Sequence, residues 1–175
     1  MKKIHLLAIC LLIFVSAQAQ KGKTFPNMTG TTLEDKQVSL PKDTKGKYTL
    51  VGIAYSQKAD EALKNWFQPV YETFIQDSEY DVNTYFVGMI SGIKEAVAGT
   101  IEKKMKKGID PVLHKHTLIY TGPIGDFKDG LGLKEKDTPY FFLLDKDGKI
   151  VYTTSGTYSD AKIEKAEEII EEASE

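Results

Sequence analysis

Residues 138–152 constrain the fold of this chain more than any other stretch, because they read as two apolar runs around a tight turn. The first run, residues 140–144, is apolar at every position, which is typical of a strand buried on both faces of a sheet. The turn, Asp145 to Gly148, carries the residues that hairpin turns favour. Pro139 cannot donate a ladder hydrogen bond, so we expect it at the start of the first strand. The stretch therefore predicts a β-hairpin.

The first nineteen residues are expected to be a secretory signal. Lys2 and Lys3 precede an apolar run that is too short for a membrane-spanning helix, and residues 17–19 (Ala-Gln-Ala) fit a signal peptidase site. Lipid attachment at Cys10 is disfavoured by the bulky Ile9 before it. Cleavage would leave one domain, residues 20–175, in the periplasm or secreted, with no further apolar stretch able to span a membrane.

Cleavage would also change the charge and the cysteine content. It removes two lysines and no acidic residue, which takes the formal net charge from −2 to −4. Cys10 is the only cysteine, so the exported domain would contain neither a disulfide nor a thiol. Every basic side chain other than histidine is a lysine, whereas bidentate recognition of phosphate and guanine favours arginine. We therefore expect no nucleic-acid partner.

Strand and helix patterns alternate along the rest of the chain. β-Branched and aromatic residues predict strands at 48–55, within 81–91 and at 117–120, after a short hairpin over 25–40. Apolar residues at helical spacing predict helices over 58–76 (kinked at Pro69), from Ile93 to near Gly108, and over 160–172. Residues 121–137 are expected to be a glycine-rich loop, long enough to be functional.

Three segments in this order resemble the exported thioredoxin-like and peroxiredoxin proteins, the redoxins. They are residues 25–29 with 33–40, residues 45–54, and residues 138–140 with 144–150. The resemblance implies an α/β thioredoxin-like fold, with a central mixed β-sheet, helices on both faces and an N-terminal β-hairpin. It also implies that the Thr138–Pro139 peptide is cis and faces the start of the helix after the first central strand.

This chain lacks the reactive residue of the redoxins. Redoxins carry a cysteine at the start of that helix, where the helix N-terminus lowers the thiol pKa. Residues 55–60 read Tyr-Ser-Gln-Lys-Ala-Asp. Because thiol chemistry needs sulfur, we expect no catalytic residue and no cofactor. The preferred hypothesis is a non-catalytic module that binds an extended polypeptide or envelope protein in a groove formed by Tyr55, Ser56, Gln57, Ala59, Asp60, Thr138, Pro139 and Tyr140.

An enzyme of another class is the alternative hypothesis. Ser56 has no base beside it in the sequence, so a helix cap is the simpler role for its hydroxyl. His114 and His116 would share one face of an extended segment, a metal half-site without a clear third ligand. The enzyme would use these histidines or the acidic residues of the 121–137 loop.

A second resemblance covers residues 116–120, 140–145 and 155–156. These segments are similar to a family of mitochondrial ATP-synthase assembly factors, which are also built like thioredoxins. This resemblance implies a role in assembling another protein rather than in redox chemistry.

Overall fold

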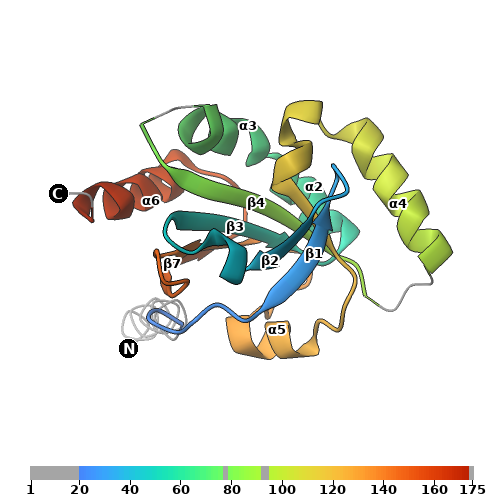
Figure 1. Cartoon of the computed structure of the whole chain (residues 1–175), viewed down its shortest axis with the longest axis horizontal. Coiled ribbons are helices and arrows are strands. Elements are labelled where there is room, and N and C mark those ends of the chain that lie inside the picture. The colour runs from blue at the N-terminus through green and yellow to red at the C-terminus, as the bar shows by residue number, and fades with distance from the viewer. Residues whose placement is uncertain (1–19, 77–78, 92–94, 174–175) are drawn as a thin grey trace, which may run out of the picture.

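A seven-stranded mixed sheet forms the centre of the molecule (Figure 1), and the computed structural model describes residues 20–76, 79–91 and 95–173. The expected signal, residues 1–19, lies outside the described residues. The strand order is β2-β1-β5-β4-β3-β6-β7. Neighbours β3, β4 and β5 pair in parallel, and the outer pairs are antiparallel. The strands are β1 (Met28–Thr32), β2 (Gln37–Leu40), β3 (Tyr48–Ala54), β4 (Val82–Met89), β5 (Thr117–Tyr120), β6 (Tyr140–Leu144) and β7 (Ile150–Ser155).

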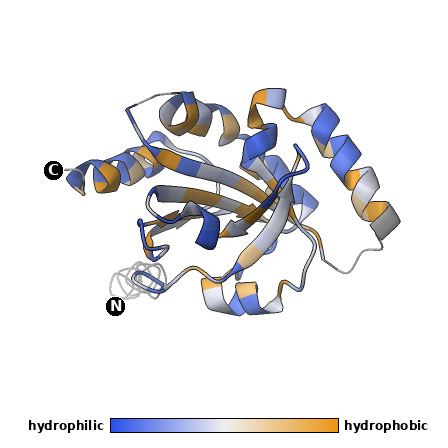
Figure 2. Ribbon diagram, in the orientation of Figure 1, coloured by the Kyte–Doolittle hydropathy of each residue, from blue (hydrophilic) through white to orange (hydrophobic). Residues whose placement is uncertain are grey.

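Helices cover both faces of the sheet, as the sequence predicted. One apolar cluster joins the sheet to α2 (Gln57–Lys64), α3 (Phe67–Val70), the π-helical η2 (Tyr71–Gln76) and α6 (Asp160–Glu172). The other cluster joins it to α5 (Gly125–Leu131), on the opposite side from α3 in Figure 1. Hydrophobic residues follow the central strands in Figure 2. The remaining helices are α4 (Glu95–Gly108) and the 3-10 turns η1 (Lys42–Thr44) and η3 (Pro111–His116).

The helix expected over 58–76 is broken, one turn before the proline expected to kink it. At Asn65 and Trp66 the backbone amides bond to carbonyls three residues back, at Ala62 and Leu63. Pro69 has no amide hydrogen to donate, and a proline ring clashes with the carbonyl four residues before it, which here belongs to Asn65. The break therefore falls between α2 and α3, and a π-helical turn follows.

The segment 121–137 is not a structureless loop. Seven of its residues form α5, which buries Phe127 and Leu131 against the sheet. Gly132 ends the helix with φ of 67°, a left-handed conformation in which glycine avoids the Cβ clash. Only residues 133–137 are left to carry the chain from the buried Leu133 to Pro139.

Trp66 links three elements at the centre of the larger apolar cluster. Its side chain is 1% exposed and stacks on the Phe141 ring of β6, with 3.9 Å between centroids. The indole Nε1 donates to the Gly156 carbonyl, 3.1 Å away, in the turn between β7 and α6. Trp66 thus fixes the α2–α3 break against the sheet and holds the turn that leads into α6.

We predict that Trp66→Ala lowers the free energy of unfolding by about 3–5 kcal/mol, because it leaves a large cavity. Trp66→Phe keeps a ring on Phe141 but removes the donor to Gly156, so it should cost less, about 1–3 kcal/mol. Urea unfolding followed by far-UV circular dichroism measures both losses. Equal losses in the two variants would contradict the packing role of the indole.

Candidate functional site

The candidate site begins where β3 ends. β3 runs through the middle of the sheet, and Tyr55 and Ser56 follow its last residue directly. Ser56 is the N-cap of α2, because its Oγ accepts a hydrogen bond from the Ala59 amide at 3.1 Å. Of the expected groove residues on this helix, Gln57 is exposed and Ala59 is fully buried. The helix cap proposed for Ser56 from the sequence is therefore present.

Ser56 also has a partner that the sequence did not indicate. Its hydroxyl donates to Asp137 Oδ1 at 3.0 Å, and Lys58 Nζ lies 3.8 Å from Asp137 Oδ2. Asp137 is 81 residues away in the chain, so no local pattern links it to Ser56. A carboxylate beside a serine hydroxyl is a weak base, and among the described residues the further side-chain partner of the pair is the Lys58 ammonium, which is not a base. The arrangement fastens residue 137 to the start of α2.

Two tyrosines extend this attachment. The Tyr55 hydroxyl donates to the Leu133 carbonyl at 2.9 Å, and the Tyr140 hydroxyl accepts from the Glu135 amide at 2.6 Å and donates to the Glu135 carbonyl at 3.2 Å. Burial raises the pKa of Tyr55, and the neighbouring Tyr140, Glu135 and Asp137 raise it further. Both hydroxyls therefore remain protonated donors at neutral pH. The expected groove residues Tyr55, Ser56 and Tyr140 all contact residues 133–137.

Asp60 is a half-buried carboxylate in the first turn of α2. Its Oδ1 lies near the carboxyl end of β4, since a Cβ added to Gly88 would stand 3.9 Å from it. Burial raises the pKa of the Asp60 carboxyl, and the Lys64 ammonium partly opposes that rise. The Asp60 charge therefore costs the fold stability once the carboxyl is ionised.

The predicted cis peptide at Thr138–Pro139 is wrong. Among the described residues the cis bond is Leu40–Pro41, and Thr138–Pro139 is trans. The trans isomer is the intrinsically preferred one, and the chain enters β6 in this form with the Pro139 carbonyl accepting from the Gly156 amide at 2.9 Å. Asp137, the residue before Thr138, still accepts a hydrogen bond from Ser56. The two groove segments are therefore adjacent, but the cis turn that was to present Thr138 is missing.

The two candidate metal-ligating histidines do not share a face of an extended segment. Asp110 caps the Val112 amide at 3.0 Å, and Pro111 starts a 3-10 turn in place of a strand. His114 Nε2 then bonds to the Ile109 carbonyl, and His116 Nδ1 donates to the Thr84 carbonyl at 2.9 Å. Burial lowers the pKa of His116. Different backbone groups hold the two rings, so they form no half-site.

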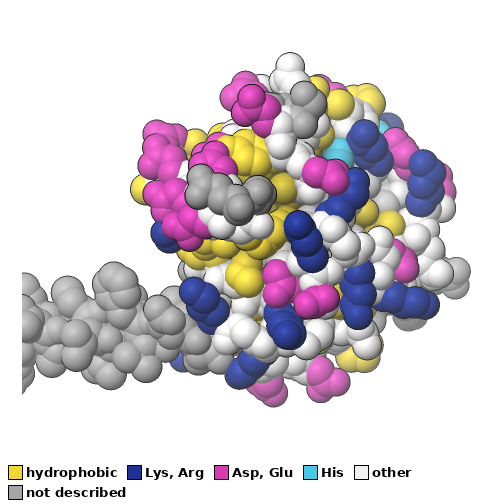
Figure 3. All heavy atoms as spheres, turned by 60° about the vertical axis from the view of Figure 1, so that its left-hand side comes forward, with side chains coloured by type: hydrophobic (Ala, Val, Ile, Leu, Met, Phe, Trp, Pro, Cys, Tyr) yellow, Lys and Arg dark blue, Asp and Glu magenta, His cyan; other side chains and the backbone are white. Residues whose placement is uncertain are grey.

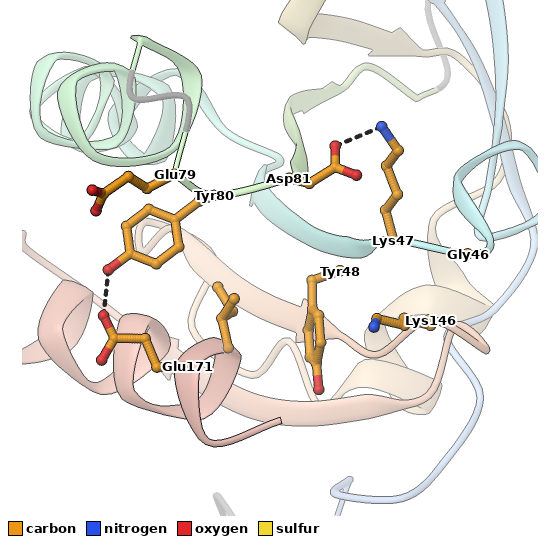
Figure 4. Close-up of a pocket in the computed structure, with 9 residues that line it drawn as sticks. Gly46, Lys47, Tyr48, Glu79, Tyr80, Asp81, Lys146 and Glu171 are labelled. Carbon is orange, nitrogen blue, oxygen red and sulfur yellow. Dashed lines mark hydrogen bonds and ion pairs between the residues drawn. The ribbon is translucent and has the colours of Figure 1, made fainter. Parts of the chain in front are cut away.

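Two surface hollows lie away from this site. One of about 360 Å³ is lined by Tyr48, Tyr80 and Glu171 among others, with the Tyr80 hydroxyl turned toward Glu171 (Figure 4). Another of about 270 Å³ includes Val82 and His116. Tyr48 and Val82 are the first residues of β3 and β4, whereas open α/β sheets bind ligands at the carboxyl ends of their strands. We therefore place the site at Tyr55–Asp60, despite the larger hollow at the other end.

The described part of the chain contains no group of three or more His, Cys, Asp or Glu residues placed to hold a metal ion. None of its helices has the length and apolar character needed to cross a membrane.

Solved structures similar to this chain show that its fold is thioredoxin-like. The exposed lipoprotein thioredoxin Etrx1 of Streptococcus pneumoniae is 22% identical, with a TM-score of 0.58, over 82% of this chain and 99% of that one. The reduced 2-Cys peroxiredoxin of Plasmodium vivax is 14% identical, with a TM-score of 0.58, over 90% and 100%. Yeast Sco1 is 13% identical, with a TM-score of 0.55, over 85% and 95%. The predicted thioredoxin-like fold is thereby confirmed, and the structures that share it include a peroxiredoxin.

The chain belongs to the ATP10 protein family, whose model matches residues 13–171. The match agrees with the second resemblance, to ATP-synthase assembly factors. A search of curated protein sequences found no match. The protein is thus a member of the ATP10 family with a thioredoxin-like fold, and its sequence from residue 20 onward contains no cysteine.

We predict that Asp60→Asn stabilises the protein at neutral pH and that the gain disappears in acid. The folded state raises the Asp60 pKa above its ordinary 3.8, so between the two values the folded protein holds more protons than the unfolded chain. The free energy of unfolding therefore falls as pH rises through that interval. Asparagine does not ionise, so the variant does not lose this stability. Urea unfolding at about pH 7 and about pH 4 measures the difference.

The matched control is Asp129→Asn, the same substitution at an exposed position on α5. An Asp60→Asn variant that is less stable than the parent at neutral pH would contradict the desolvation argument.

Proposed function

We propose that this protein is an exported, non-catalytic assembly module that binds a polypeptide at the start of α2. The binding surface would comprise Tyr55, Ser56, Gln57 and Asp60 together with residues 138–140. Extended polypeptide or an envelope protein is the proposed partner. Membership of the ATP10 family and the resemblance to ATP-synthase assembly factors support a subunit of that enzyme as the polypeptide.

One observation carries the proposal, the arrangement at the position where redoxins keep their reactive cysteine. Ser56 stands there with its hydroxyl engaged twice, as acceptor from Ala59 and as donor to Asp137. A serine without an aligned base cannot replace a thiolate as nucleophile. The scaffold thus keeps a surface at the helix start without the thiol, and binding is the function that such a surface supports.

The charge distribution supports a protein partner over a nucleic acid. Acidic side chains gather in one region of the face shown in Figure 3 and lysines are scattered over another. A basic patch or stripe marks a nucleic-acid interface, whereas on this face further acidic side chains lie among the lysines. The chain also lacks arginine, the side chain suited to bidentate contacts with phosphate.

Site-specific photocrosslinking tests the proposal. Benzoylphenylalanine at the exposed Gln57 should crosslink to a polypeptide of the ATP synthase when the protein is expressed in its own cells. The same group at the exposed Asp147 is the matched control, because that hairpin turn lies at the other end of β3, where Leu144 pairs with Thr49. Crosslinks of equal yield from both positions, or from Asp147 alone, would place the binding surface elsewhere.

Export leads to a separate prediction about processing. Protein recovered from a native-like host should begin at Gln20, because Ala17 and Ala19 fit a signal peptidase site. Intact mass spectrometry of the purified protein measures this directly. A mass that retains residues 1–19, or a lipid on Cys10, would refute export by this route.

A further inference from the structure

Residues 133–137, called the strap below, hydrogen-bond to Tyr55, Ser56 and Tyr140 of the proposed binding surface. The strap begins at Leu133, which is 2% exposed, and leads to the buried Pro139. Its other four residues, Lys134 to Asp137, are all exposed. Apolar burial therefore anchors the strap at Leu133 and just beyond its end at Pro139, and polar contacts hold residues 134–137.

The hydroxyl groups that hold the strap belong to the proposed binding surface. The Tyr55 hydroxyl donates to the Leu133 carbonyl, the Tyr140 hydroxyl bonds to both the amide and the carbonyl of Glu135, and the Ser56 hydroxyl donates to Asp137. The surface assigned to a partner is thus already engaged by the protein's own chain.

The kind of contact indicates what can replace the strap. Tyr55 and Tyr140 bond only to main-chain groups of the strap, which every polypeptide carries. The strap adds one side-chain contact, the Asp137 carboxylate at the Ser56 hydroxyl and near the Lys58 ammonium. An extended segment with one acidic side chain would reproduce all of these interactions. Recognition of main-chain groups in this way is largely independent of sequence.

The contacts of the strap are reversible. Hydrogen bonds between neutral groups contribute little net free energy when water can replace either partner, and an exposed lysine–carboxylate pair contributes less. The hydrogen bonds at Glu135 and Asp137 are exposed, whereas the one from Tyr55 to Leu133 is buried. A segment with exposed hydrogen bonds opens more readily than the core around it, so residues 134–137 open while Leu133 stays in place. Opening would leave α5 and β6 in place, because Leu131, Leu133 and Phe141 are buried in the apolar core whether or not the polar contacts of the strap are made.

We propose that the strap is an internal mimic of the partner, which closes the binding surface in the free protein and is displaced by an extended polypeptide carrying an acidic residue. This inference rests on the proposed function and adds the class of ligand and its regulation. The apparent dissociation constant then equals the intrinsic one divided by the fraction of molecules with an open strap. A change that opens the strap raises affinity without altering the binding surface.

Asp137→Ala is the opening variant, since it removes contacts made by the strap and leaves Tyr55, Ser56 and Tyr140 intact. Hydrogen exchange at the Glu135 amide, which donates to Tyr140, should accelerate by at least about tenfold. Affinity for fluorescent reduced, carboxymethylated α-lactalbumin, an unfolded acidic polypeptide, should rise about threefold or more. Asp129→Ala removes the same charge from an exposed position on α5 and is the matched control.

A bridged variant tests the opposite direction. In residues 20–175 carrying Ser56→Cys and Asp137→Cys, the two new thiols are the only ones, so dibromomethane can join them with one methylene group. The bridged protein should lose binding of the lactalbumin probe by at least about tenfold relative to the same variant with both thiols capped by iodoacetamide. Because the two samples share one sequence, a folding defect would affect both.

The outcomes separate the two proposals. Two results would show that the strap does not cover the surface: faster exchange at Glu135 with unchanged affinity in Asp137→Ala, or equal binding by the bridged and capped samples. The proposed function would still stand if the parent protein binds the probe. If neither the parent nor Asp137→Ala binds the probe and Gln57 gives no crosslink, the proposed function fails, and the inference fails with it.

Discussion

The ring of Phe141 lying over Gly52 is the contact on which the rest of the structure depends. The two residues are cross-strand partners in β6 and β3, and a Cβ on Gly52 would stand 2.6 Å from the Phe141 ring. No side chain fits there without displacing the Phe141 ring, which also stacks on Trp66. Trp66 in turn sets the position of α2 and α3 and holds the turn before α6 through Gly156. The contacts among Gly52, Phe141 and Trp66 therefore position the end of β3 and Ser56, which follows it.

Local patterns made the fold predictable. The apolar run at 140–144 and the strand at 48–54 are buried on both faces, and the sequence is apolar on both faces at those positions. The break in the first helix could also have been located from the sequence, because a proline interferes with the carbonyl four residues before it. The kink was instead expected at Pro69 itself. The isomer at Thr138–Pro139 could not be predicted, because the two isomers differ by only about 0.5–1 kcal/mol and tertiary contacts decide between them.

The candidate site was predictable only in part. Residues 55–60 follow a recognisable strand, so their place at the start of a helix follows from the order of elements. Asp137 carries no such signal, because it lies in a charged segment whose lysines and acids look equally solvated in the sequence. Its role comes from the packing of α5, which turns the chain at Gly132 and brings the strap back to Tyr55 and Ser56. Contacts between segments this far apart depend on the finished tertiary structure.

The start of α2 explains how a thioredoxin-like scaffold can persist without its thiol. The first amides of a helix carry a partial positive charge, and this field stabilises a reactive thiolate in the redoxins. Here the Ser56 side chain satisfies one of those amides, and the Asp137 carboxylate supplies the negative charge that the field favours. The electrostatic requirement of the helix end is met from within the chain, so nothing in the fold requires a cysteine. A carboxylate held by a hydrogen bond, unlike a covalent intermediate, can be exchanged for another carboxylate without any chemical step. Such an exchange is what the proposed reversible binding of a polypeptide would require.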